Sequence, residues 1–426
     1  MSPKTPVLRN IPISYFFAFW GNLSFTHGVW MIFLYSRGYS LTQLGILEGF
    51  FHVTTFLMEV PTGAVADLWG RKVSRIAGRL FFFTSLLLMY FGQGLFVQIL
   101  GFAVCAIGYN LESGAGEALI YDSLKQLAQE DRFMRIKGRL ELILQTAFVI
   151  SFLGGGYLAV RDYGLLFLLS GIVVLLSVVS ALFFIEPAID KTQSPGDQED
   201  TRDSRSDSSL GVRIFHSVVR QTRDAFTVLL KTPSLFALIV FVELIFTFVT
   251  ILFFFLQTHW KAAGFSEWDI GLVFAFQCGL SGITGLFASR VEKRLGPRGI
   301  LLVMPLLLIL VLWGVALTPW SRLFFIATGL LEGVIIIAVS DYINRKIPSE
   351  TRATVLSFQS MIFSAFMILL FPLVGLAGDR FSLGTAFTML ALTGTAVYLV
   401  YLIFFLRGKR EVRSVPEGDG ETVRVP

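Results

Sequence analysis

Long apolar stretches recur twelve times along the chain, and they constrain its fold more than any other feature. A helix that crosses a bilayer needs about 20 predominantly apolar residues, and lipid offers no partner for an unpaired backbone group. The sequence therefore predicts an all-α, polytopic membrane protein. The expected spans are 12–35, 41–67, 75–92, 94–122, 135–160, 164–186, 233–258, 268–291, 299–317, 322–343, 353–378 and 384–406.

The composition agrees with a membrane protein. Hydrophobic residues make up 54% of the 426 residues and charged residues only 15%, whereas soluble domains carry about 25% charged residues. The first apolar stretch, which begins near Ile11, is longer than the apolar region of a signal peptide, about 7–15 residues. We expect it to be retained as the first membrane helix. Cys105 and Cys278 lie inside apolar runs and are expected to be small buried side chains, not a disulfide or metal site.

The basic residues fall on one side of the expected topology. If both termini are cytoplasmic, 30 of the 35 Lys and Arg residues lie inside. The five on the outside are Arg37, Arg161, Lys261, Arg322 and Arg380. Such a bias predicts a multi-pass protein of the cell membrane, plasma or inner, with both termini in the cytoplasm. The same bias accounts for the net charge of +5, so nucleic acid is not an expected partner.

A polar segment divides the spans into six and six. The stretch from Lys191 to Leu210 is rich in Ser and Asp and has mixed charge, so it cannot bury apolar area and is expected to be a linker. The predicted domains are an N-terminal six-helix bundle (1–190), a cytoplasmic linker (191–230), a C-terminal six-helix bundle (231–410) and a cytoplasmic tail (411–426).

The two predicted bundles repeat each other. At one common offset, Asp122 matches Asp341 and Gly156 matches Gly375. Parallel repeats of six helices joined by a linker are a layout found among secondary transporters. The repeat favours a transporter made of two related halves.

The stretch "GAVADLWGRK" is the most specific motif. It resembles the signature loop of the major facilitator superfamily, Gly-x-x-x-Asp-x-x-Gly-Arg-Arg/Lys, and its positions are filled by Gly63, Asp67, Gly70, Arg71 and Lys72. The resemblance implies a transporter that alternates between inward-open and outward-open states, like the drug and metabolite exporters of that family.

The motif also has a physical interpretation. Gly63 allows close helix packing, and Asp67 can latch to a facing helix across the two halves. Gly70 permits a tight turn. On the neighbouring span, Asp122 is expected to partner the basic turn, whereas Arg75 reads as an ordinary positive-inside residue.

Two departures from the family pattern leave the direction of transport open. The fifth span keeps the glycines Gly154 to Gly156 without the proline of family antiporters. The arginine linked to proton coupling in the fourth span is replaced by Asn110 or Glu112. Uptake by symport or facilitated diffusion is therefore an alternative to efflux.

Ionisable residues inside spans are costly and mark functional sites. Glu48, His52 and Glu59 lie on one stripe of the second span, because they follow helical spacing. By the resemblance, the first, fourth, seventh and tenth spans line the central cavity. The candidates for contact with substrate or protons are Glu48, His52, Glu59, Glu112, Glu117, Glu243 and Glu332. Asn22, Thr26 and His27 add further polar groups in the first span.

The sequence contains no nucleotide-binding loop, no metal-binding motif and no nucleophile motif, so neither a cofactor nor enzymatic activity is expected. The leading hypothesis is a monomeric secondary transporter that exports a small molecule, with protons as the coupling ion. A transporter-like receptor that binds without transport is the alternative from another class. Substrate identity does not follow from the sequence.

Overall fold

A computed structural model of the protein describes residues 7–187, 233–346 and 352–413. Every regular element in these ranges is a helix, and no strand occurs in them. The predicted linker at 191–230 and the tail beyond residue 413 lie outside the described residues. The N-half contains η1 (Val7–Arg9), α1 (Asn10–Asn22), α2 (Trp30–Ser36), α3 (Leu41–Trp69), α4 (Arg71–Phe91), α5 (Leu95–Gln126), η2 (Glu130–Arg132), α6 (Phe133–Arg161) and α7 (Tyr163–Leu182). The C-half contains α10 (Pro233–Ala262), α11 (Glu267–Gly285), α12 (Ala288–Leu317), α13 (Ser321–Lys346), α14 (Arg352–Arg380) and α15 (Leu383–Arg413).

The helix lengths fit twelve membrane crossings. Within the described ranges, nine helices are long and apolar enough to span a bilayer, and α11 with the bent start of α12 gives a tenth. The two other crossings are α3, which has 29 residues but carries polar side chains, and the pair α1 and α2. The expected all-α architecture of two six-helix bundles is confirmed.

The expected first span, 12–35, is interrupted and consists of α1 and α2. The backbone leaves the helical conformation at Leu23 and resumes it at Trp30. Asn22 and Ser24 fall at the break, where side chains that compete for backbone hydrogen bonds disfavour helix. The Ser24 N–H donates to Ser151 Oγ on α6 at 2.8 Å, so the break is supported by a neighbouring helix.

The predicted eighth span, 268–291, is also too long. Helix α11 ends at Gly285, and the chain then turns by 64° into the start of α12. Within α12, Gly296 has a φ of 68° and divides the short first segment from the long one.

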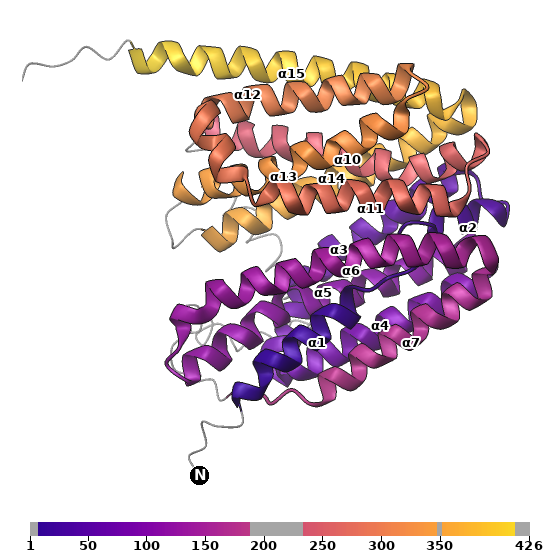
Figure 1. Ribbon diagram of the computed structural model, residues 1–426, viewed down its shortest axis with the longest axis vertical. Helices are drawn as coiled ribbons and strands as arrows, with labels where there is room; N and C mark the ends of the chain where they lie inside the picture. Colours follow the sequence, from indigo (N-terminus) through magenta and orange to yellow (C-terminus); the bar gives the residue numbers. More distant parts are fainter. Residues whose placement is uncertain (1–6, 188–232, 347–351, 414–426) are drawn as a thin grey trace, which may run out of the picture.

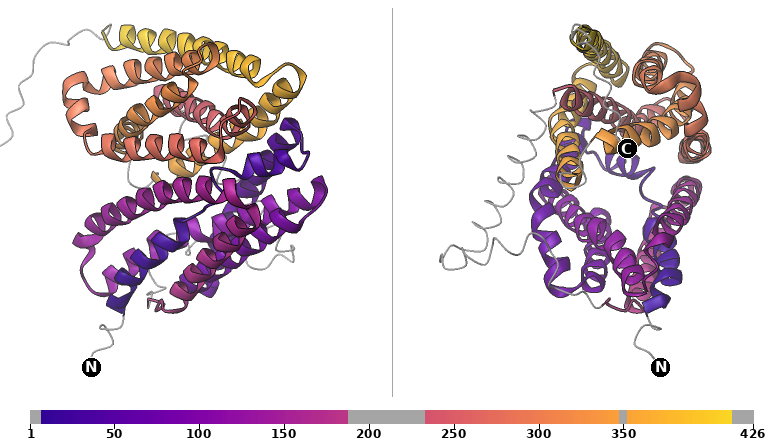
Figure 2. Two further views of the ribbon diagram at one scale, coloured as in Figure 1. Left: turned by 45° about the vertical axis from the view of Figure 1, so that its right-hand side comes forward. Right: turned by 90° about the vertical axis from the view of Figure 1, so that its left-hand side faces the viewer.

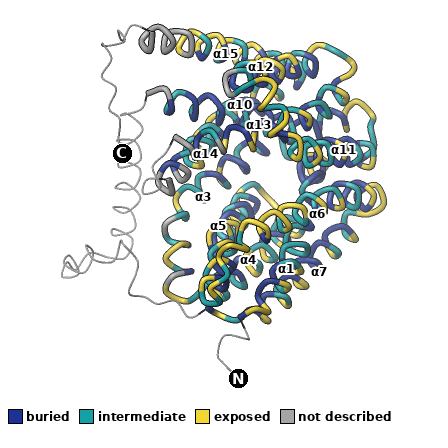
Figure 3. The backbone as a smooth tube through the Cα atoms, turned by 60° about the vertical axis from the view of Figure 1, so that its left-hand side comes forward, coloured by how far each residue is buried: buried dark blue, intermediate teal, exposed yellow. Residues whose placement is uncertain are grey.

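The two halves pack side by side (Figures 1 and 2). In the N-half α4 packs on α5 and α3 on α5, and in the C-half α11 and α12 both pack on α13. Exposed positions run along the outer faces of the bundles (Figure 3). Large apolar side chains such as Leu168 and Leu310 are exposed there, as a lipid-facing surface requires.

The halves meet through α3 against α14 and α6 against α11. The two glycines that the repeat aligns lie at these contacts. A Cβ at Gly156 of α6 would come within 2.6 Å of the Glu267 carbonyl at the start of α11. A Cβ at Gly375 of α14 would collide with the Leu41 carbonyl at the start of α3. Only glycine permits this close approach at either site, so the repeat of the sequence is also a repeat of the interface.

The molecule has two ends that differ. We name them the Gly38 end, with the turn between α2 and α3, and the Gly70 end, with the turn between α3 and α4. Helices α6 and α11 lie close together at the Gly38 end and diverge towards the Gly70 end (Figure 1). Near the Gly70 end, a Cβ on Gly63 would meet no atom within 4 Å, and Leu68 and Trp69 are exposed. Among the described residues, the closest glycine contacts between the halves lie towards the Gly38 end.

Candidate functional site

The turn at Gly70 is held by a residue of the segment that follows α7. Gly70 has a φ of 96°, a conformation that favours glycine. The backbone N–H groups of Arg71 and Lys72 donate to the two carboxylate oxygens of Glu186 at 2.7 and 2.9 Å. Glu186 follows α7 and caps the start of α4, where the helix dipole favours an acid. No local sequence pattern indicates Glu186, because its partners lie 115 and 114 residues away along the chain.

Arg71 forms an ion pair of 2.7 Å with Asp122 of α5. Both partners lie in the N-half, so this pair ties α4 to α5 and does not cross the interface. The side chain of Asp67 lies outside the described residues, and its latch to the other half stays a prediction. The same holds for the gating role of Asp122.

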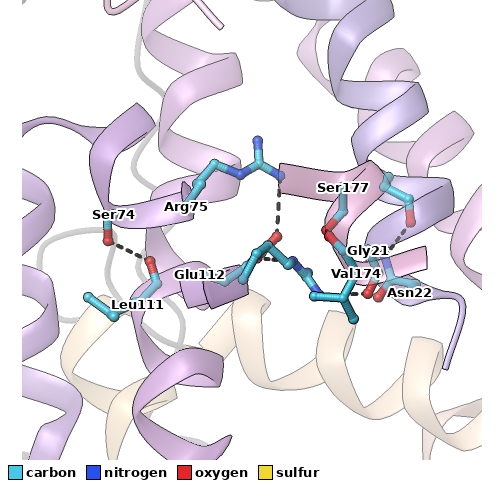
Figure 4. A network of polar contacts seen from close by, with 10 residues as sticks. Gly21, Asn22, Ser74, Arg75, Leu111, Glu112, Val174 and Ser177 are labelled. Carbon is cyan, nitrogen blue, oxygen red and sulfur yellow. Dashed lines mark hydrogen bonds and ion pairs between the residues drawn. The ribbon is translucent and has the colours of Figure 1, made fainter. Parts of the chain in front are cut away.

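The view of Arg75 as an ordinary positive-inside residue is wrong. Its side chain is buried in the N-half and packs against the rings of Phe17 and Phe184. The Nη2 atom of Arg75 lies 3.4 Å from Glu112 Oε1, as Figure 4 shows. Arg79 Nε lies 2.7 Å from the other oxygen of Glu112. One carboxylate therefore serves two guanidinium groups.

Glu117, on the same helix as Glu112, has a different environment. It pairs with Lys137 of α6 at 2.8 Å, and both side chains are about half exposed, at 62% and 49%. A pair of this kind contributes little to stability, because water screens it.

A cavity of about 220 Å³ lies between α1, α4, α5 and α6 near the Gly70 end. Arg75, Glu112, Glu117 and Lys137 contribute to its lining, with Ser14 from α1. Glu112 and Glu117, which the sequence predicts as candidates, thus share one cavity with the buried Arg75.

The polar residues predicted to share one face of α3 include a close pair, Glu48 and His52. Glu48 and His52 are both buried, and His52 Nε2 lies 3.7 Å from Glu48 Oε1. Below them, the Asn110 side chain of α5 donates to the Thr55 carbonyl at 2.7 Å. Glu59 lies seven residues beyond His52, about two helical turns along α3. It is only half-buried.

The two acids of the C-half have amide partners. Gln359 of α14 donates to Glu243 of α10, and Gln277 of α11 donates to Glu332 of α13 at 2.6 Å. Glu243 is buried, and Glu332 is half-buried. Among the described residues, no cation pairs with either acid or with Glu48, except for the imidazole of His52.

The break in the first helix places His27 between the halves. Its ring contacts Phe148 and Phe152 of α6 and Phe253 and Phe254 of α10, with centroids 5.2–6.1 Å apart. Discontinuous helices at a repeat interface are typical of transporter binding sites. The stretch Gly21-Asn22-Leu23-Ser24, with three residues that disfavour helix, was the available signal for this break.

A second residue missed from the sequence joins the halves at the Gly38 end. Asp379 of α14 accepts from the Leu41 and Thr42 N–H groups of α3 at 3.0 and 2.8 Å, and from Thr42 Oγ1 at 2.6 Å. It caps a helix of the opposite half.

Comparison with known proteins gives the family. A family model described as the Major Facilitator Superfamily matches residues 13–365. The chain belongs to this superfamily. An uncharacterized MFS-type transporter of Bacillus subtilis (strain 168), YxaM, is 23% identical over 390 residues, which cover 88% of this chain and 90% of the relative. An uncharacterized transporter of Buchnera aphidicola subsp. Schizaphis graminum is 29% identical over 120 residues, 28% of each chain.

Solved structures of other transporters share the fold. The nucleoside transporter NupG has a TM-score of 0.72 at 14% identity, over 94% of this chain and 99% of NupG. A POT family transporter in complex with 5-aminolevulinic acid has a TM-score of 0.71 at 13% identity, covering 93% and 96%. A bacterial homolog of the human lysosomal transporter Spinster, in an inward-facing conformation, has 0.66 at 15%, covering 95% and 96%. The superfamily member described here is therefore a multi-pass membrane transporter and not an enzyme. In the described part of the chain no cluster of metal-ligating side chains occurs.

Proposed function

We propose that the protein is a secondary active transporter of a small molecule that works by alternating access, and that protons drive the export of its substrate. The family supplies the transport activity. The fold supports the cycle, because the halves are joined at the Gly38 end and diverge towards the Gly70 end (Figure 1). With the Gly70 end in the cytoplasm, this arrangement corresponds to an inward-open state.

The observation that carries proton coupling is the set of Glu48, Glu243 and Glu332. Each lies within a helix of the membrane region, and its neighbours are an imidazole or an amide. An ionised carboxylate in such a place costs several kcal/mol unless it is paired, and binding a proton removes that cost. Groups of this kind exchange protons when the cavity opens to water on either side.

The direction of transport rests on the motif at Gly63 to Lys72, which resembles that of exporters. The alternative, uptake by symport or facilitated diffusion, is favoured by the glycines of α6 that lack the accompanying proline. One experiment separates these possibilities. Purified protein is reconstituted into liposomes with a panel of labelled metabolites on one side, and a pH gradient is imposed with and without an ionophore that dissipates it.

Export by proton antiport predicts that acid outside the liposomes drives loss of a compound from the lumen, and that the ionophore abolishes the loss. Glu243→Gln or Glu332→Gln should leave binding intact and remove the response to the gradient. Accumulation with acid outside indicates symport. Flux of equal rate with and without the pH gradient contradicts proton coupling. Binding of a compound without any flux indicates a receptor.

A further inference from the structure

The chain bends between α11 and α12 instead of turning directly from one long helix into the next. Helix α11 ends at Gly285, and the segment Ala288–Gly296, which we call the bent segment, lies at 64° to it. Gly296 has a φ of 68° and precedes the long part of α12, as Gly70 with a φ of 96° precedes α4 in the N-half. The helix before Gly70, α3, is one helix of 29 residues. Of these two turns, only the one in the C-half therefore has a helical segment inclined strongly to the membrane-crossing helix before it.

Three cations share one exposed face of the bent segment. Arg290, Lys293 and Arg294 follow the spacing i, i+3, i+4, and all three are exposed. In the ranges that the structure describes, none of the three forms an ion pair, and the Arg290 guanidinium lies 5.1 Å from the centroid of the Phe287 ring. Three cations and one acid, Glu292, leave the segment with a net charge of 3 − 1 = +2. The positive charge of this face thus has no acidic partner within the described protein.

The basic turn of the N-half differs, because its cations are used inside the bundle. Arg71 pairs with Asp122 at 2.7 Å, and Lys72 Nζ donates to the Leu182 carbonyl at 2.7 Å. The bias of basic residues towards one side of the membrane accounts for the presence of cations in both turns. Only the bent segment leaves them available to a partner outside the protein.

Apolar side chains flank the cations and are uncovered as well. Leu286 is 79% exposed, Phe287 43% and Leu295 41%. Ala288, which lies nearly opposite Arg290 at about 100° per residue, is buried and fixes the side that faces the bundle. Apolar residues beside cations on an inclined helix are typical of an interfacial segment, whose apolar side chains enter the acyl region while the cations reach the headgroups.

We propose that the bent segment is a binding surface for an anionic phospholipid. Arg290, Lys293 and Arg294 contact the phosphate and headgroup oxygens, for which the guanidinium groups supply paired N–H donors. Leu286 and Leu295 contact the acyl chains. The segment lies at the Gly70 end, which the charge bias predicts to be cytoplasmic, and anionic lipids of that leaflet attract basic segments next to the membrane. This surface goes beyond the proposed transport function and does not depend on it.

The test measures lipid contact at the bent segment of the purified full-length protein in nanodiscs. In a background without Cys105 and Cys278, a fluorophore is attached to Ser289→Cys, an exposed position next to Arg290. The discs consist of phosphatidylcholine with a minor fraction of lipid brominated on its acyl chains, either phosphatidylglycerol or phosphatidylcholine, and bromine quenches the fluorophore on contact. Brominated phosphatidylglycerol should bind at least about fivefold more tightly than brominated phosphatidylcholine, since one cation near an anionic surface contributes about that factor. High salt should reduce this preference.

The variant Arg290→Gln/Lys293→Gln/Arg294→Gln should abolish the preference for phosphatidylglycerol. These side chains are exposed, so we expect the variant to fold. If it does not, the salt dependence of the unsubstituted segment decides, because a preference without a charge contribution does not respond to salt.

The matched control is Arg132→Gln/Arg135→Gln/Arg139→Gln, which removes the same number of exposed cations from the N-half. It should leave quenching at position 289 unchanged. Equal quenching by the two brominated lipids, a preference that survives in the bent-segment variant, or a preference that disappears in the control would each overturn the proposal. Quenching by neither lipid would also overturn it, because protein would then cover the segment.

Discussion

Acidic residues in this protein differ by the partners that the fold gives them. Three acids in the part of the N-half near the Gly70 end pair with Arg or Lys side chains. They are Asp122, Glu112 and Glu117. Glu48 and Glu243 are buried beside neutral groups instead. Paired acids hold helices together, whereas acids without a cation suit the binding and release of protons.

Two acids on α5 allow this distinction to be measured. Glu112→Gln removes the only carboxylate that Arg75 and Arg79 share among the described residues, and we expect a loss of about 3–5 kcal/mol, as for a broken buried pair. Glu117→Gln removes an exposed pair and should cost at most about 1 kcal/mol. The measurement is thermal unfolding of the purified variants in one detergent. Equal losses of stability would contradict the buried cluster.

At the scale of elements, the start of α3 is the main joint between the halves. The N-terminal N–H groups of a helix lack partners inside the helix, and Asp379 of α14 satisfies two of them at Leu41 and Thr42. Ser40 and Gln43 add a capping box from within α3. A cap that comes from the opposite half forms only while the Gly38 end is closed.

We therefore expect Asp379→Asn to shift the protein towards a state that is open at the Gly38 end. A neutral amide is a weaker acceptor for the helix N-terminus, and lost caps cost about 1 kcal/mol. The readout is the distance between spin labels at Tyr35→Cys and Phe381→Cys, which should lengthen in part of the population. Asp162→Asn is the control, because Asp162 caps α7 in its own half at Leu165. An unchanged distance in Asp379→Asn would argue against the latch.

At the scale of the whole molecule, the two ends of the bundle pair should face opposite sides of the membrane. The bias of basic residues predicts that the Gly70 end is cytoplasmic. In a background without Cys105 and Cys278, a cysteine at Met134 should react with a membrane-impermeant thiol reagent only in inverted vesicles. A cysteine at Phe381 should react only in intact cells. Both side chains are well exposed, at 74% and 69%, so a failure to react is informative. The reverse labelling pattern would show that the Gly70 end faces outwards, and the proposed topology and direction of transport would then be reversed.

Much of the fold follows from local sequence patterns. Apolar length predicts the number of spans, and the common offset of Gly156 and Gly375 predicts two related halves. The prediction of the first span from apolar length was inaccurate, because contacts with another helix determine the backbone conformation there. The first span is broken near Ser24, whose backbone is held by Ser151 of α6, and no apolar-length argument detects that support.

The sequence by itself determined that the chain is helical, spans a membrane twelve times and carries the turn at Gly70, because these properties depend on residues close together in the chain. Tertiary structure alone decided the partners of the charged groups. Arg75 and Glu112, Glu186 and Arg71, and Asp379 and Leu41 meet across long stretches of chain. The free energy of a buried charge depends on its partner in space, and one sequence without its fold does not specify that partner.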